Sequence, residues 1–248
     1  MIRRTATTRV LIPLLVVVSI TAVLPGLVVW DDSGQPGAAL DDCRSRANPC
    51  DGGLDAACGQ TGAWLARQLG KQCRVIVRTP LVLGGDLSKQ ELDRWHRECL
   101  APASRSMAAC YFPNRPNEPI TVLLFAGSVS YRAHAKRLFG EEEISDCGYY
   151  RPHLRTVIVN AGRGNGPALH ELTHALMAFD FPDAPDWFSE GLASLNEQSR
   201  ISADGRAIEG QVGRRLSTVQ AAIRRDRLAT LESLIQTSDF HGPREKIN

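Results

Sequence analysis

Three residues within five positions have side chains and a spacing that suit metal chemistry. His170 and His174 are four positions apart, so on a helix both imidazoles leave the same face. Two imidazole nitrogens at this spacing can hold one zinc ion at about 2.0–2.1 Å each. Glu171 lies one step round the helix, where it can reach a water molecule on the open side of the metal as a general base.

A third ligand is expected downstream, because a catalytic zinc ion needs three protein ligands and one open position. Glu190 follows His174 by sixteen residues, in a segment that reads Ser-Glu-Gly-Leu-Ala. Pro182 and Pro185 let the chain reverse between the two segments and start a second helix, with Glu190 in its first turn facing the histidines. The alternative is a pair of surface histidines and a glutamate that only complements the helix dipole.

The sequence pattern around these residues predicts an α+β fold. From residue 74 onward the chain alternates between apolar strand-like runs and helices, and the run 120–125 is typical of a strand buried on both faces. Residues 149–150 and 156–160 flank a turn, which predicts a hairpin. We expect a small twisted sheet packed on the helix that carries the histidines, followed by a mostly helical C-terminal part.

The N-terminal residues predict a membrane segment. Three arginines precede the uncharged run 10–30, and two aspartates follow it. At about 1.5 Å per residue, a run of this length crosses a hydrocarbon core of about 30 Å. The charge asymmetry keeps the N-terminus in the cytoplasm and exports residues 31 onward. A signal anchor would leave a single-pass protein in the cell envelope, and a cleaved signal peptide would leave a secreted one.

Three regions follow from these patterns. Residues 1–30 are the signal anchor or signal peptide, residues 31–73 form an exported cysteine-bearing linker segment, and residues 74–248 form the domain with the metal site. Within the linker segment, one short helix is expected to end at Gly70.

Charge and cysteine content narrow the expected partners. Lys plus Arg number 29 and Asp plus Glu number 27, and this balance gives no global field for nucleic acid. Seven cysteines in an exported chain predict at least two disulfides, with at least one thiol left over because seven is odd. Reduced cysteines buried in the core are the alternative.

The His170–His174 motif, together with residues 187–193, resembles the gluzincin metallopeptidases, and within them the peptidase-MA-like bacterial domains. The similarity covers roughly residues 75–235, and the two motifs are its specific part. The resemblance implies a zincin-like fold with His170, His174 and Glu190 as zinc ligands and Glu171 as base. It also implies that residues 156–160 form the edge strand, along which a peptide substrate adds as a further strand.

The donor that stabilises the oxyanion is less clearly marked. Zincins often use a tyrosine or a histidine, and Tyr149, Tyr150, His153 and His241 are the candidates. Packing within a strand is the alternative role for the two tyrosines. Related domains often continue with further helices, so the domain is expected to be shortened at its C-terminal end.

These inferences predict a membrane-anchored or exported zinc peptidase that hydrolyses peptide bonds with metal-activated water. Its partners would be a peptide or protein substrate and the membrane around residues 10–30. The alternative is a non-catalytic, zinc-stabilised binding domain tethered to the cell envelope.

Overall fold

The computed structural model describes residues 51–202, 207–213 and 216–236. The predicted membrane segment lies outside these residues. Among the described residues, no helix has the length and apolar character that a bilayer crossing requires. All of them belong to one compact unit, Asn48–Asn248.

A five-stranded mixed sheet forms the centre of the fold, and this confirms the predicted α+β class. Its three inner strands are parallel to one another, whereas each outer strand is antiparallel to its neighbour. In spatial order the strands are β1 (Arg74–Arg78), β2 (Leu81–Gly85), β3 (Ile120–Phe125), β5 (Thr156–Asn160) and β4 (Gly148–Arg151).

The predicted hairpin is confirmed, but the predicted edge strand is wrong. β5 pairs with β3 on one side and with β4 on the other, and all five of its residues are buried. β4 therefore forms the edge of the sheet, because the second strand of the hairpin is the one that joins β3. The uninterrupted apolar run of β5 already indicated a strand covered on both faces.

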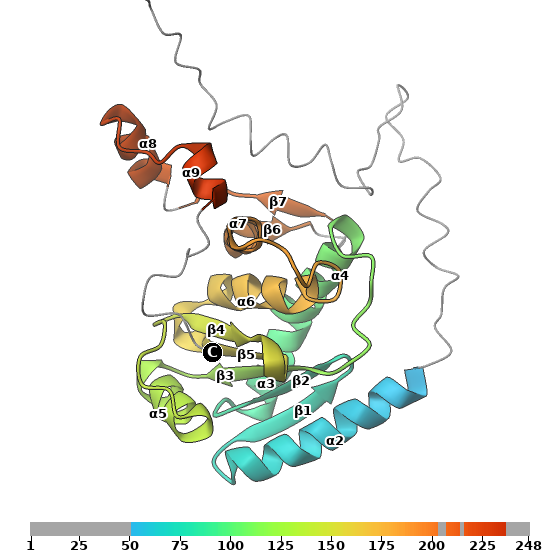
Figure 1. The fold of residues 1–248 in the computed structure, drawn as a ribbon. Coiled ribbons are helices and arrows are strands. Elements are labelled where there is room, and N and C mark those ends of the chain that lie inside the picture. The colour runs from blue at the N-terminus through green and yellow to red at the C-terminus, as the bar shows by residue number, and fades with distance from the viewer. Residues whose placement is uncertain (1–50, 203–206, 214–215, 237–248) are drawn as a thin grey trace, which may run out of the picture. The chain divides into compact units, whose positions relative to one another are not determined.

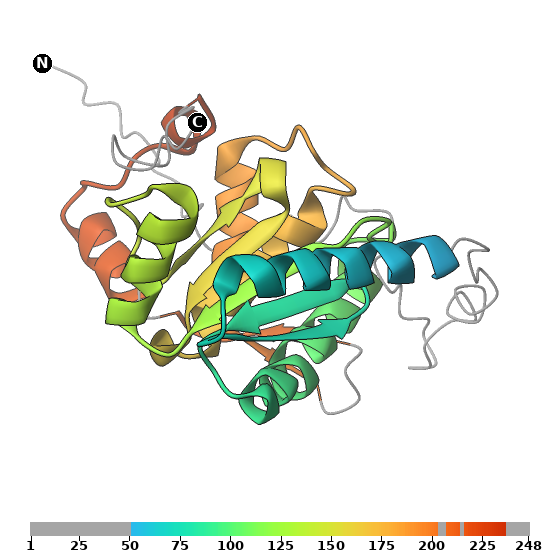
Figure 2. The same ribbon diagram turned by 90° about the horizontal axis from the view of Figure 1, so that it is seen from below.

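Helices cover both faces of the sheet. One face carries α3 (Lys89–Trp95), the π-turn η4 (His96–Leu100), α4 (Ala101–Cys110) and α6 (Asn165–Met177). The other face carries α2 (Asp51–Leu69) and α5 (Ser128–Phe139). Figure 1 shows α6 and α2 on opposite sides of the sheet, and Figure 2 shows α2 crossing in front of it.

Alternation along the strands explains the two apolar cores. In β5, Val157 and Val159 face the core beneath α6, whereas Ile158 faces the core beneath α2 and α5. Leu83 and its neighbour Val82 in β2 divide in the same way, and both are 0% exposed. A strand with side chains to bury on both faces must be apolar throughout, as these strands are.

Helix α2 corrects the prediction for residues 31–73. It ends at Gly70, as expected, where φ is +77°. However, it has 19 residues rather than a few, and its Leu65 and Leu69 are buried against the sheet. Residues 51–69 thus belong to the folded unit and do not form a linker. The helix has little apolar contrast between its faces, which is why its length was missed.

The C-terminal part is helical with one small hairpin. Helix α7 is followed by two short antiparallel strands and two short helices. Two 3-10 turns lie earlier in the chain, η5 (Pro152–Leu154) and η6 (Ala161–Arg163). The bounds are α7 (Asp186–Glu197), β6 (Ser199–Ile201), β7 (Ile208–Gly210), α8 (Leu216–Arg224) and α9 (Leu231–Gln236).

The described cysteines form no disulfides, in contrast to the prediction. Five of them are free thiols: Cys58, Cys73, Cys99, Cys110 and Cys147. The first three are buried in the cores on separate elements, and Cys73 Sγ lies 3.5 Å from His134 Nε2. Burial in the core was the alternative use that the sequence left open. Cys43 and Cys50 lie outside the described residues.

Candidate metal centre

Helix α6 presents its two histidines on the side that the sheet does not cover. Its opposite side buries Leu169, Leu172 and Leu176 in the core, which fixes the rotation of the helix. The side chains of His170 and His174 remain 16% and 13% exposed. They are therefore largely shielded from water but still accessible to a small ligand.

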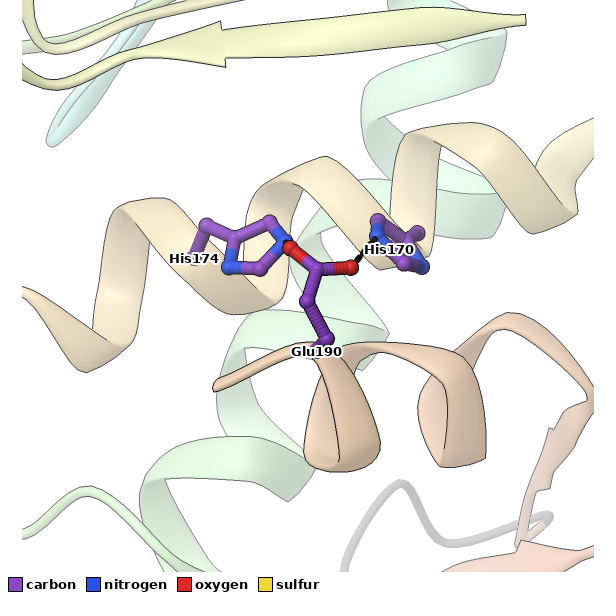
Figure 3. A group of neighbouring side chains, drawn as sticks. All are labelled: His170, His174 and Glu190. Atoms are coloured by element: carbon purple, nitrogen blue, oxygen red, sulfur yellow. Dashed lines mark ion pairs between the residues drawn. The ribbon is translucent and has the colours of Figure 1, made fainter. Parts of the chain in front are cut away.

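Helix α7 brings Glu190 between the two imidazoles. His170 Nε2 lies 3.3 Å from Glu190 Oε2, and His174 Nε2 lies 3.3 Å from Glu190 Oε1. One ligand atom from each of the three side chains lies within 4.8 Å of the others. Figure 3 shows the carboxylate rising from α7 toward both rings. The group could hold a metal ion, as its sequence spacing indicated.

The two nitrogen–oxygen separations of 3.3 Å are compatible with ligands that share a metal ion. A tetrahedral site with bonds of about 2.0–2.1 Å has ligand atoms about 3.3 Å apart. A hydrogen bond between a charged imidazole and a carboxylate is about 2.7–2.9 Å long. The observed nitrogen–oxygen separations of 3.3 Å match the first value. The donor set of two imidazoles and one carboxylate also suits a borderline divalent cation.

Two further residues on α7 face the outer nitrogens of the histidines. Ser189 Oγ lies 2.9 Å from His174 Nδ1, and Glu197 Oε2 lies 3.9 Å from His170 Nδ1. The Ser189 hydroxyl is within hydrogen-bond distance and can hold the His174 ring in its orientation. The Glu197 carboxylate is too distant for a hydrogen bond and acts on His170 through its charge. The sequence analysis missed both, although Glu197 lies two helical turns after Glu190 and so shares its face.

A buried polar contact locks the two helices together. Asn196 Nδ2 donates a hydrogen bond to Thr173 Oγ1 over 3.2 Å, and both residues are 0% exposed. The pairings 174–189, 173–196 and 170–197 show that α6 and α7 run antiparallel. The position of Glu190 relative to the histidines therefore depends on packing between the helices as well as on the short connection.

The charges of the three side chains support one another. Burial of Glu190 favours its neutral form, but the bonds from His170 and His174 outweigh burial and lower its pKa well below the usual range. Burial alone would lower the pKa of His170, yet the contact with Glu190 and the charges of Glu171 and Glu197 raise it.

Glu171 lies on the flank of α6 that faces the edge strand. It is 9% exposed, and a Cβ atom at Gly148 of β4 would stand 3.4 Å from its Cγ. The same Cβ would be 2.9 Å from the carbonyl oxygen of Ile158. Glycine at position 148 therefore leaves the space that the Glu171 side chain uses beside the strand.

Three of the four oxyanion candidates lie in different surroundings, and His241 lies outside the described residues. Tyr149 packs in the core beneath α2 and α5, and its hydroxyl donates a hydrogen bond to Glu141. It faces the side of the sheet opposite to α6. His153 is exposed in η5, beyond the end of β4. Tyr150 alone packs in the core that contains α6, on the same face of β4 as Gly148. Alternation along the strand explains the difference.

Comparison with known proteins finds no match among protein-family models, curated proteins or solved structures.

Proposed function

We propose that the chain is a zinc-dependent peptidase of the gluzincin type. The observation that carries the proposal is the convergence of His170, His174 and Glu190, with their ligand atoms within 4.8 Å of one another, beside a buried Glu171. Two imidazoles and one carboxylate are a ligand set of catalytic zinc sites that keep a fourth position open for water. The antiparallel packing of α6 and α7 is consistent with a zincin-like fold.

Zinc in this site would lower the pKa of a bound water molecule to about 7 and polarise a substrate carbonyl. His170, His174 and Glu190 bind the ion, Ser189 orients the His174 ring, and Glu197 acts on His170 through its charge. Glu171 takes a proton from the attacking water and later gives it to the leaving amine. General-base help of this kind is worth about 10²–10⁴-fold in rate.

The exposed edge of the sheet supports a peptide as substrate. Among the described residues, no strand pairs with the outer side of β4. Its free backbone groups can bind an extended peptide as an additional strand. Because Gly148 of β4 contacts the flank of Glu171, a peptide on this edge would run beside the general base. The role first expected of residues 156–160 thus belongs to β4.

Tyr150 is the residue that we propose as the oxyanion donor. It follows Gly148 by two positions and so projects from the same face of β4, toward α6. Burial raises the pKa of its phenol, with a smaller opposing effect of Arg155, so it stays protonated and able to donate. Tyr150→Phe should lower the hydrolysis rate without lowering zinc content.

We place the enzyme in the cell envelope or outside the cell on the basis of residues 1–30. Protease added to intact spheroplasts should degrade the part of the chain after residue 30. Full protection would contradict this orientation.

Two carboxylate variants test the assigned roles in the full chain. Glu190→Ala removes a ligand, so zinc affinity and thermal stability should both fall, since metal binding energy contributes to folding. Glu171→Gln keeps the size of the side chain and leaves the ligands in place. It should retain about one zinc per chain and lose about 10²–10⁴-fold in hydrolysis of a mixed peptide substrate.

Glu143→Gln is the matched control, because Glu143 is exposed in the loop before β4. It should behave like the parent protein. Loss of zinc in Glu171→Gln and its retention in Glu190→Ala would contradict the assignment. A parent protein that binds zinc, yet hydrolyses no peptide, would favour the binding-domain alternative.

A further inference from the structure

A shallow cavity, open to solvent, lies where α6 turns into α7. Its volume is about 480 Å³, and residues between Asp180 and Phe188 line it. None of its lining residues belongs to the group that could hold the metal. A cavity of this size lies within the range of small-ligand pockets and exceeds what one side chain of a bound peptide needs.

Aromatic rings form the walls of this cavity. Phe188 contacts Phe181 and Trp187 edge to face, with ring centroids 6.3 and 5.8 Å apart. Phe181 in turn contacts Phe112 of the core. The rings are therefore held in position by their neighbours, and they offer π faces as well as apolar surface to an occupant.

The charges of this cavity are all negative. Its lining contains Asp180 and Asp183 and no lysine or arginine. Asp180 Oδ1 accepts a hydrogen bond from the amide of Asn114 and its Oδ2 is buried, so the exposed Asp183 is the carboxylate that an occupant can reach. The whole stretch 164–199 contains six acidic residues and no lysine or arginine. Asp186 lies in the first turn of α7, where it offsets the positive end of the helix dipole. Aromatic faces combined with carboxylates attract a cation rather than an anion.

The same turn already holds one guanidinium group. The Cζ atom of Arg155 lies 4.9 Å from the centre of the Phe179 ring, one residue before Asp180. This arginine is also paired with Glu118, which leaves the carboxylates of the cavity to another cation. Arg155 thus contacts an aromatic ring and a carboxylate at the same time.

The cavity lies at one end of the candidate metal centre. Since α6 and α7 are antiparallel, their connection lies at the His174 end of the site. Trp187 precedes Glu190 by three positions, which is about one helical turn of 5.4 Å.

We propose that this cavity is a substrate subsite that takes an arginine or lysine side chain near the scissile bond. The proposal rests on the proposed peptidase function, which it deepens by naming the class of peptide. The aromatic walls bind the apolar stem, and Asp183 binds the charged end.

A degenerate heptapeptide mixture tests the subsite with the zinc-loaded full chain. Mass spectrometry of the products gives residue frequencies at each position around the cut. One position should show basic residues enriched about tenfold over norleucine, the size of effect expected from a charge-assisted hydrogen bond to a carboxylate. In Asp180→Asn/Asp183→Asn the enrichment should fall close to one. Asparagine at 180 keeps the acceptor for the amide of Asn114, and Asp183→Asn alone serves if the pair does not fold.

Zinc content is measured on every variant, and Glu143→Gln is the control. Together they identify losses of hydrolysis that have a cause other than the cavity. Basic enrichment that survives both aspartate substitutions, or enrichment of acidic residues, would overturn the subsite. If no peptide is cut, the proposed function fails. The subsite is then judged by equilibrium dialysis of the same mixture against zinc-loaded Glu171→Gln, and a bound fraction without basic enrichment would overturn it.

Discussion

Replacing Gly148 with alanine should displace β4 and Glu171 and thereby slow hydrolysis without removing the metal. The added Cβ would lie 2.9 Å from the carbonyl oxygen of Ile158 and 3.4 Å from Glu171 Cγ. Carbon and oxygen atoms approach to about 3.3–3.6 Å even in favourable contacts, so the strand must move by about half an ångström. The metal ligands on α6 and α7 do not contact this atom.

The size of both effects follows from this displacement. Overpacking a tight site costs about 1–3 kcal/mol, and each kcal/mol lowers Tm by about 2–4 °C in a chain of this size. A misplacement of about 1 Å can cost about 10²-fold in rate, so half an ångström at the general base corresponds to about tenfold. Zinc content should stay at the parent level.

Gly191→Ala is the matched control. Gly191 lies next to Glu190 in α7, but no atom lies within 4 Å of an added Cβ. Alanine there should stabilise the helix by about 0.5–1 kcal/mol and leave the rate unchanged. Thermal unfolding, zinc content and peptide hydrolysis are measured on both variants. A Gly148→Ala protein as fast and as stable as the parent would refute the reasoning.

Further predictions concern the ligands, the core and the thiols. Glu197→Gln and Ser189→Ala should each weaken zinc affinity by about 10–100-fold in chelator competition, and unchanged affinity would exclude a supporting role. Leu83→Ala should lower the free energy of unfolding by about 2–5 kcal/mol in urea, because Leu83 is 0% exposed. Because the pKa of His170 is raised from 6.5, protons compete with zinc at low pH, so zinc affinity should increase as the pH rises through 6.5 and above. Titration calorimetry from pH 5.5 to about 8 measures this, and an affinity that falls with rising pH would contradict it. Burial raises the pKa of Cys99 to about 12, so its thiol should resist alkylation until the protein is unfolded.

Local patterns predicted the site because its residues are close in sequence. The spacing of His170 and His174 places both rings on one helix face, and the proline-broken connection returns the chain so that Glu190 meets them. Ser189 and Glu197 were not predicted, since their roles depend on the angle at which α7 crosses α6. That angle is set by packing, including the buried Asn196–Thr173 contact, which no local pattern encodes.

Strand order was the part of the fold that the sequence left undetermined. The pattern identified the hairpin of residues 149–160 but could not show which of its strands joins β3. The same choice decides which of the two tyrosine side chains faces α6. The sequence therefore could not distinguish Tyr149 from Tyr150 as the oxyanion donor. The length of α2 was missed for a different reason: its apolar residues are few, and the sheet that buries Leu65 and Leu69 comes later in the chain.

The coordination of zinc in the purified full chain tests the central claim most directly. X-ray absorption at the zinc edge should show one zinc per chain, surrounded by nitrogen and oxygen at about 2.0–2.1 Å, with the outer scattering of imidazole rings. Glu190→Ala should lose this signal. A shell of sulfur at about 2.3 Å would place the metal on cysteines instead, and a chain that takes up no zinc would contradict the metal site itself.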